Sequence, residues 1–276
     1  MELGRVGVWA TYRRIGEENA GAAAALAEEL GYGTFWLGGS PRLPAVRPLL
    51  EATETLAVGT SIVNVWAYDP ADLAAEYAEL EDDFPGRLMV GIGIGHPEAT
   101  REYRKPLSTM REFLDGVDEA AKPISHGRRS LAALGPKMLE LSADRTLGAL
   151  PYFTPVEHTA DARRRLGAGP LLAPEVAMAV ETDHARGHSL AREYAATYLR
   201  LTNYSSNLLR YGFTSDDVRD GGSDRLIDAV VPHGSPEDLA AVVQSHFDAG
   251  ADHVAIQTIG ESGVPRRGWT ALAAVV

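Results

Sequence analysis

The sequence predicts an α/β protein that folds as a (β/α)8 barrel, the TIM barrel, in a single domain over residues 1–276. Short apolar segments alternate with longer amphipathic ones from end to end, which is typical of βα units around a parallel sheet. Eight of the apolar segments have the length of strands, and eight strands close such a barrel. A chain of 276 residues with 45% hydrophobic residues is long enough to bury the core of this fold.

The residues at the joints support this alternation. Gly31 and Gly250 follow Ala- and acid-containing helical segments, and each precedes a predicted strand by a few residues. Glycine accepts the left-handed conformation that ends a helix. Ser235 stands before a proline and two acids, which is the pattern of a helix start. In chain order, the predicted strands span residues 6–10, 34–37, 58–65, 88–94, 130–134, 148–152, 176–180 and 253–257, and residues 166–174 and 216–224 are expected to be surface loops.

Composition excludes several classes of function. The chain has no cysteine, so disulfides, thiolate nucleophiles, Cys-ligated zinc and iron–sulfur clusters are ruled out, and a cytoplasmic location is expected. A net charge of −12 argues against binding to nucleic acids or anionic membranes. There is no signal-peptide pattern, and no apolar run reaches the roughly 18 residues of a membrane span. The expected partner is therefore a small-molecule substrate.

In a barrel of this kind the active site lies where the strands end, so the residues at strand ends are the candidates. Trp9 lies near the end of the first predicted strand, Asn64 lies near the end of the third, and Trp66 follows the third. Flat aromatic side chains suit a planar ring system, and an asparagine amide is able to hydrogen-bond the edge of the ring. The alternative is an ordinary buried strand with an aromatic residue in its loop.

The fourth strand ends in a glycine-rich segment that includes Gly95 and is followed by His96. Glycines allow a ligand to approach the backbone closely. The segment lacks the third glycine of the G-x-G-x-x-G dinucleotide fingerprint, which disfavours a Rossmann fold. His96 is a candidate general acid or base. Its alternative role is structural.

Two later strand ends complete the set of candidates. Leu134, Gly135 and Pro136 form a turn at the start of a helix, where free N–H groups are able to bind phosphate, or the turn is simply a well-capped helix start. Tyr152 and Phe153 follow the sixth strand, and either line the same pocket or pack under a loop.

A metal site and hydrolase chemistry have little support. His184 and His188 have the spacing of a helical metal pair with Asp183 beside them, but Gly187 intervenes and no third ligand is evident, so no metal is expected. The G-x-S-x-G motif of serine hydrolases does not occur.

Taken together and in this order, these segments resemble the bacterial luciferase-like monooxygenase superfamily. The resemblance is closer to its branch of oxidoreductases that use coenzyme F420, an 8-hydroxy-5-deazaflavin. It covers nearly the whole chain, and its most recognisable parts are residues 56–64, 84–95, 135–141 and 234–239.

The resemblance implies a luciferase-like barrel and several cofactor contacts. A non-prolyl cis peptide at Ser61–Ile62 is expected to back the deazaflavin, Asn64 and Gly95 to lie near its ring, and the turn at Leu134, Gly135 and Pro136 to hold its phosphate. Gly38, which follows the second predicted strand, is expected to lie near the same ring. Trp9, Trp66, Tyr152 and Phe153 would line the substrate pocket, and a homodimer is expected by analogy. Arg13, Arg14, Arg42 and Arg47 either attract the anionic tail of the coenzyme or are solvated surface charges.

The chain departs from the family pattern at two positions. Many deazaflavin-dependent members have a polar side chain at the end of strand two, whereas this chain has Gly38, Gly39 and Ser40. Sugar-phosphate dehydrogenases of the family have an acid where this chain has His96. The leading hypothesis is hydride transfer between F420 and an organic substrate, with His96 as the catalytic residue. The alternatives are an FMN-dependent monooxygenase and a barrel that binds a flavin without turnover.

Overall fold

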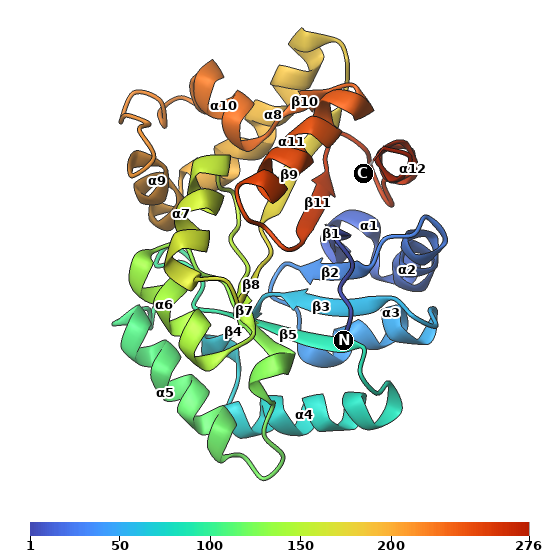
Figure 1. Ribbon diagram of the computed structural model, residues 1–276, viewed down its shortest axis with the longest axis vertical. Coiled ribbons are helices and arrows are strands. Elements are labelled where there is room, and N and C mark those ends of the chain that lie inside the picture. Colours follow the sequence, from blue (N-terminus) through green and yellow to red (C-terminus); the bar gives the residue numbers. More distant parts are fainter. Residues whose placement is uncertain (276) are drawn as a thin grey trace.

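A computed structural model describes residues 1–275, and all of its strands belong to one parallel sheet that is surrounded by helices (Figure 1). The strands are β1 (Val6–Thr11), β2 (Thr34–Gly38), β3 (Ala57–Ser61), β4 (Val63–Asn64), β5 (Leu88–Gly93), β6 (Arg129–Leu131), β7 (Gly148–Ala149), β8 (Leu171–Leu172), β9 (Glu175–Val180), β10 (His233–Gly234) and β11 (Val254–Thr258). The α-helices are α1 (Tyr12–Ile15), α2 (Ala20–Glu29), α3 (Arg47–Glu51), α4 (Pro70–Asp83), α5 (Pro106–Glu119), α6 (Pro136–Arg145), α7 (Val156–Leu166), α8 (His184–Leu199), α9 (Thr202–Leu209), α10 (Asp224–Val230), α11 (Pro236–Asp248) and α12 (Arg266–Ala273).

The sheet closes into the predicted eight-stranded barrel. Its strand order is β10-β9-β11-β1-β2-β3-β5-β6-β7-β8. Strands β8 and β9 are two parts of one barrel strand, separated by Ala173 and Pro174. The Ala173 N–H donates to the Ala149 carbonyl at 3.0 Å, and the Pro174 carbonyl accepts from the Ala255 N–H at 3.0 Å. These bonds join β7 to β11 through one strand, so the ring is complete and the barrel prediction is confirmed.

Several boundaries differ from the predicted ones. The predicted strands 130–134 and 148–152 end at Leu131 and Ala149 in the structure. The predicted strand 58–65 is interrupted at Ile62, and the Ser61–Ile62 peptide bond is cis, as the family resemblance implies. The prediction of a surface loop over 166–174 is wrong in its second half. Leu171 and Leu172 form β8, because the Leu171 N–H donates to the Leu147 carbonyl at 2.7 Å. A strand of two residues is too short to show a periodic pattern.

Two tryptophans and a histidine fill much of the barrel interior. Trp9 and Trp36 belong to a buried cluster with Met89, Leu150, Ala173 and Ala255. The Trp36 Nε1–H donates to His253 Nε2 at 2.9 Å, and His253 Nδ1 lies 2.8 Å from the Gly4 carbonyl. Because the indole is only a donor, these partners make Nδ1 the protonated nitrogen of the imidazole. Burial lowers the pKa of His253 to about 4.

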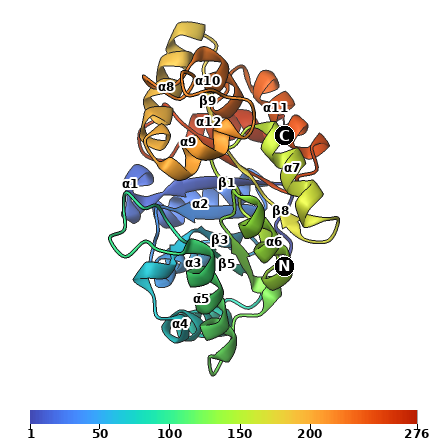
Figure 2. The same ribbon diagram turned by 90° about the vertical axis from the view of Figure 1, so that its left-hand side faces the viewer.

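An insertion between β9 and β10 covers one end of the molecule. It contains α8, α9 and α10, which are grouped together in the upper part of Figure 2. These helices build a second apolar core with Phe153 and Ile259. Ala191 and Ala195 of α8 are part of this core, which explains the small residues on that helix. None of the helices in residues 1–275 combines the length and the apolar character that crossing a membrane requires.

We predict that acid destabilises the fold through its buried histidines. Burial lowers the pKa values of His158, His246 and His253 to about 4, below the ordinary value of 6.5. The unfolded chain therefore takes up protons first as the pH falls, and stability that is present above pH 6.5 is lost toward pH 4. Between pH 7 and pH 5 we expect a loss of about 1–2 kcal/mol for each histidine, measured as a lower urea midpoint.

A matched pair of variants tests this assignment. In His253→Gln the dependence of the urea midpoint on pH should be weaker, whereas His126→Gln, at an exposed position, should keep the full dependence. Equal pH dependence in the wild type and His253→Gln would contradict the prediction.

Candidate active site

The ends of β3, β5 and β6 form a shelf of small and apolar groups. The side chain of Ile62 lies over Gly93, so a side chain at position 93 would overlap Ile62 and approach Ala132. Ser61, Ile62 and Ala132 are only half-buried. The shelf therefore has an accessible surface at the mouth of the barrel, where a planar group is able to lie against it.

Asn64 and Trp66 form one side of this shelf. The Asn64 Oδ1 accepts from the Trp66 N–H at 3.1 Å, and the Trp66 Nε1–H donates to the Ile94 carbonyl at 2.7 Å. Gly95 passes so close to the Asn64 amide that a Cβ there would lie 3.0 Å from Nδ2. Asn64 thus contacts two other predicted site residues, Trp66 and Gly95. It also caps the turn that follows it.

Trp9 occupies the space next to the end of β2. A methyl group at Gly38 would overlap the six-membered ring of Trp9. Trp9 is 6% exposed and its Nε1 has no hydrogen-bond partner within residues 1–275. The absence of a polar side chain at position 38 is therefore explained by packing, because the indole of the neighbouring strand fills that position.

Tyr152 and Phe153 lie in an aromatic cluster at the mouth. Phe153 stacks on Tyr198 of α8 with 5.3 Å between ring centroids, and Tyr204 of α9 packs against both Tyr152 and Phe153. Tyr152 also lies 5.3 Å from the ring of Trp9. Phe153 has a φ of 55°, which is rare for an aromatic residue and marks a sharp turn after β7. The predicted pocket residues from β1 and β7 are therefore neighbours.

His96 lies where the segment after β5 meets α9. Its ring is 4.8 Å from that of Tyr204, and its Nδ1 is 3.3 Å from Asn203 Nδ2. Glu98 accepts from the Thr202 N–H at 2.9 Å, which attaches the same segment to the start of α9. Burial lowers the pKa of His96. The imidazole is thus neutral near pH 7 and faces the aromatic cluster.

The turn at Leu134, Gly135 and Pro136 lies beside a cation. The Leu134 carbonyl is 3.0 Å from His158 Nε2, and a Cβ on Gly135 would be 3.2 Å from Nη1 of Arg210. Pro136 and Arg210 line a groove of about 500 Å³. Gly135 precedes the first turn of α6, so free N–H groups and a guanidinium are close together here.

Four arginines are predicted candidates for binding the anionic tail of the coenzyme, and they lie in different surroundings. Arg42 pairs with Glu76 at 2.9 Å and Arg47 with Asp83 at 2.8 Å. Arg14 donates to the Glu261 carbonyl at 3.1 Å. Arg13 is exposed and has no ion pair among the described residues, so it is the least committed of the four.

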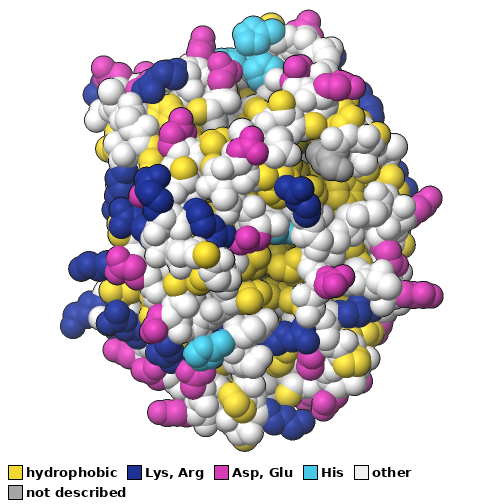
Figure 3. Space-filling model, viewed as in Figure 1, with side chains coloured by type: hydrophobic (Ala, Val, Ile, Leu, Met, Phe, Trp, Pro, Cys, Tyr) yellow, Lys and Arg dark blue, Asp and Glu magenta, His cyan; other side chains and the backbone are white. Residues whose placement is uncertain are grey.

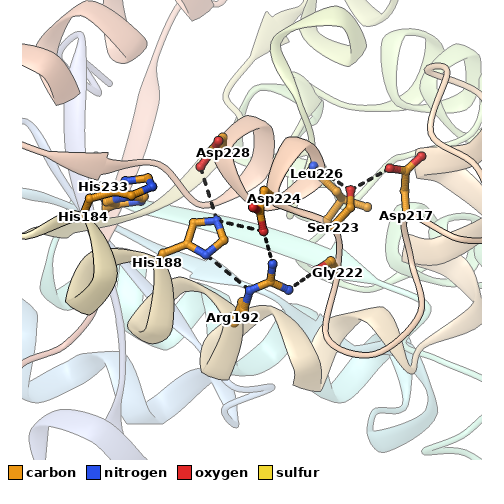
Figure 4. Close-up of polar contacts among 10 residues, drawn as sticks. All are labelled: His184, His188, Arg192, Asp217, Gly222, Ser223, Asp224, Leu226, Asp228 and His233. Atoms are coloured by element: carbon orange, nitrogen blue, oxygen red, sulfur yellow. Dashed lines mark hydrogen bonds and ion pairs between the residues drawn. The ribbon is translucent and has the colours of Figure 1, made fainter.

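The histidine pair lies in the first turns of α8, which follows β9, and histidine side chains are visible at the upper edge of the molecule in Figure 3. The structure adds His233, whose Nε2 is 3.0 Å from His184 Nδ1. His188 turns toward Asp224 and Asp228, each 3.7 Å from its Nε2 (Figure 4). Within residues 1–275 no three such groups are arranged to hold a metal ion. Asp183 caps α8 through the Arg186 N–H.

A second groove, of about 420 Å³, lies at the opposite end of the barrel. It is bordered by Arg5 and Val6 at the start of β1 and by Phe247 at the end of α11. Active sites of this fold lie at the other ends of the strands. This groove is therefore separate from the candidate active site.

Sequence reasoning missed several residues at the mouth. Tyr194 and Tyr198 lie one helical turn apart on α8, and their i, i+4 spacing was the available signal. Glu175 is a buried acid at the start of an apolar strand, and Gln257 is near the end of β11. Arg210 follows α9 and had no distinguishing pattern, because its approach to Gly135 depends on how α9 packs.

The luciferase-like monooxygenase family model matches residues 3–253. The chain belongs to this family. A putative coenzyme F420-dependent oxidoreductase of Mycobacterium tuberculosis is 26% identical over 196 residues, which cover 55% of this chain and only 56% of that relative.

Solved structures support the fold of this family member. An F420-dependent secondary alcohol dehydrogenase, in complex with an F420–acetone adduct, aligns with a TM-score of 0.77 and 15% identity over 100% of this chain and 98% of that one. A type II Baeyer–Villiger monooxygenase of Pseudomonas putida, in complex with FMN, aligns with a TM-score of 0.68 and 12% identity over 99% of this chain and 96% of that one. At these identities the likeness is one of fold.

We predict that Gly38→Ala displaces Trp9, because the added methyl group overlaps the indole. Overpacking of this kind costs about 1–3 kcal/mol. The variant should have a lower urea midpoint and altered tryptophan fluorescence. Gly127→Ala is the control, since nothing lies within 4 Å of a Cβ at that position. Wild-type stability and fluorescence in Gly38→Ala would show that the ring does not occupy this space.

Proposed function

We propose that this luciferase-like protein is a coenzyme F420-dependent oxidoreductase that transfers a hydride between the deazaflavin and an organic substrate. The observation that carries the proposal is the half-exposed shelf of Ser61, Ile62 and Ala132 over Gly93. It offers a flat apolar surface at the strand ends, bordered by Asn64. The similarity to an F420-dependent relative and to the fold of an F420-dependent alcohol dehydrogenase agrees with this choice.

The residues present fit the coenzyme. A side chain at position 93 would overlap Ile62. Glycine at this position therefore leaves the surface of the shelf open to a planar ring. Asn64 would meet the ring edge, and the Gly135 turn with Arg210 would hold the phosphate through N–H groups and a positive charge. When bound, F420 supplies a carbon that accepts or donates a hydride. The chain places the substrate over that carbon and excludes water with its aromatic cluster.

FMN is the alternative cofactor, and the FMN complex among the solved structures favours testing it. Both molecules have a tricyclic ring and a phosphate, so the shelf and the Gly135 turn do not separate them. A third possibility is a barrel that binds its cofactor and has no turnover.

We predict micromolar or tighter binding of oxidised F420 to the purified protein, measured by fluorescence and calorimetry, with FMN titrated in parallel. Arg210→Ala should weaken F420 binding by about tenfold, equivalent to about 1.4 kcal/mol, because a charged phosphate contact is lost. Arg47→Ala, on the ion pair with Asp83, should bind F420 like the wild type. Binding of FMN alone would move the assignment to a flavin monooxygenase, and binding of neither would refute the cofactor.

We also predict that His96→Ala keeps its affinity for F420 and loses turnover once a substrate is in hand. A neutral imidazole at the mouth is suited to accept or return the substrate proton. General acid–base groups typically contribute about 10²–10⁴-fold to the rate. Normal turnover in His96→Ala, with normal coenzyme binding, would remove His96 from the mechanism.

A further inference from the structure

Three tyrosine hydroxyls meet inside the mouth of the barrel. The Tyr152 hydroxyl is 2.7 Å from that of Tyr194 and 2.8 Å from that of Tyr198. Tyr152 and Tyr194 both reach the Gln257 Oε1, at 3.1 and 2.9 Å. All three rings retain accessible surface. The hydroxyls thus form a connected polar group on the wall of an otherwise aromatic mouth.

A buried carboxyl lies beside this group. Register pairs Glu175 of β9 with Ala255 of β11, whose side chain is part of the interior cluster, so Glu175 also faces the barrel interior. It is 3% exposed, and its Oε2 accepts from the Phe153 N–H at 3.4 Å. Its Oε1 has no partner within residues 1–275. Burial raises the pKa of Glu175 to about 8, so the carboxyl is mostly uncharged at pH 7.

An unpaired donor lies on β1, which is separated from the strand of Glu175 by β11. The pairing of Val8 with Ile256 places the next residues, Trp9 and Gln257, side by side on β1 and β11. Trp9 Nε1 is buried and without a partner in the described chain, and the indole lies against Tyr152. A buried donor or acceptor without a partner is unfavourable unless a ligand or water meets it.

The charges of the residues around Trp9, Tyr152 and Glu175 determine which chemical groups are able to bind there. Among the described residues, no lysine or arginine forms a hydrogen bond or ion pair with Trp9, Tyr152, Glu175 or Gln257. A phosphate or carboxylate placed against Trp9 and Glu175 would be buried without a directly paired cation, which is unfavourable. A hydroxyl or carbonyl group needs no counter-ion. It is able to accept from the indole or a phenol and, if a hydroxyl, to donate to the carboxyl oxygen.

We propose that Trp9, Tyr152 and Glu175 form the specificity site for the oxygen-bearing end of an uncharged alcohol or carbonyl substrate. The inference rests on the proposed function, because binding of the substrate oxygen would position the carbon that bears it for hydride transfer to or from F420. Anionic groups would be held elsewhere, at the Gly135 turn beside Arg210. The substrate body would lie against Phe153, Tyr198 and Tyr204.

The test is calorimetric binding of two pairs of probes at pH 7, to the protein alone and to the protein saturated with oxidised F420. The pairs are cyclohexanol with cyclohexanecarboxylate, and 2-propanol with acetate. We expect the alcohol of at least one pair to bind tenfold or more tightly than its carboxylate. Tyr152→Phe and Glu175→Leu should each weaken alcohol binding by about tenfold, which corresponds to about 1.4 kcal/mol. Glu175→Gln should keep most of the affinity.

Tyr32→Phe is the matched control, because its hydroxyl donates to the Trp269 carbonyl at the other end of the barrel. It should bind all probes like the wild type. Equal binding of alcohol and carboxylate, no binding of either alcohol, or unchanged alcohol binding in folded Tyr152→Phe would overturn the proposal. F420 affinity is measured separately in every variant, so a failure of the cofactor assignment is distinguishable from a failure of the alcohol site.

Discussion

The packing of two indoles on two glycines is the constraint on which the barrel mouth depends. Trp9 of β1 lies over Gly38 of β2, and Trp36 of β2 lies over Gly59 of β3. Each indole takes the interior volume that the next strand would otherwise fill. The second strand therefore has no polar group to offer at its end, and the chemistry of the mouth must come from other strands and from the helices that cover them.

Those groups come from segments that are far apart in the chain. The segment after β5 is attached to the start of α9 through Glu98 and Thr202, and α8 brings Tyr194 and Tyr198 against Tyr152. The insertion that covers the mouth thereby also supplies its hydroxyls. The two sides of the mouth also differ in charge. Its Gly135 side has a guanidinium, whereas its β1–β9 side has neutral donors and acceptors around a buried carboxyl.

Apolar periodicity was sufficient for the barrel, because each long strand is buried on both faces and separated from the next by a helical segment. It failed for β8, whose two residues have no periodicity and are strand only because Leu147 and Ala149 lie alongside. The strand-end rule selected Asn64, Trp66, Gly135 and Tyr152 as candidates. It did not select Glu175, because that residue begins β9, whereas the rule selects residues at the ends of strands.

The sequence by itself determined the strand and helix order, the glycine positions that allow close packing, and the family. These features depend on residues that are near one another in the chain, so local patterns reveal them. Only the tertiary structure decided that Trp9 fills the place next to Gly38, that Arg210 lies beside Gly135, and that the indole of Trp9 and the carboxyl of Glu175 are both buried without a hydrogen-bond partner in the described chain. Such contacts join residues separated by tens to hundreds of positions. Their distances are set by how the closed sheet and the α8–α9 insertion pack, which no local pattern encodes.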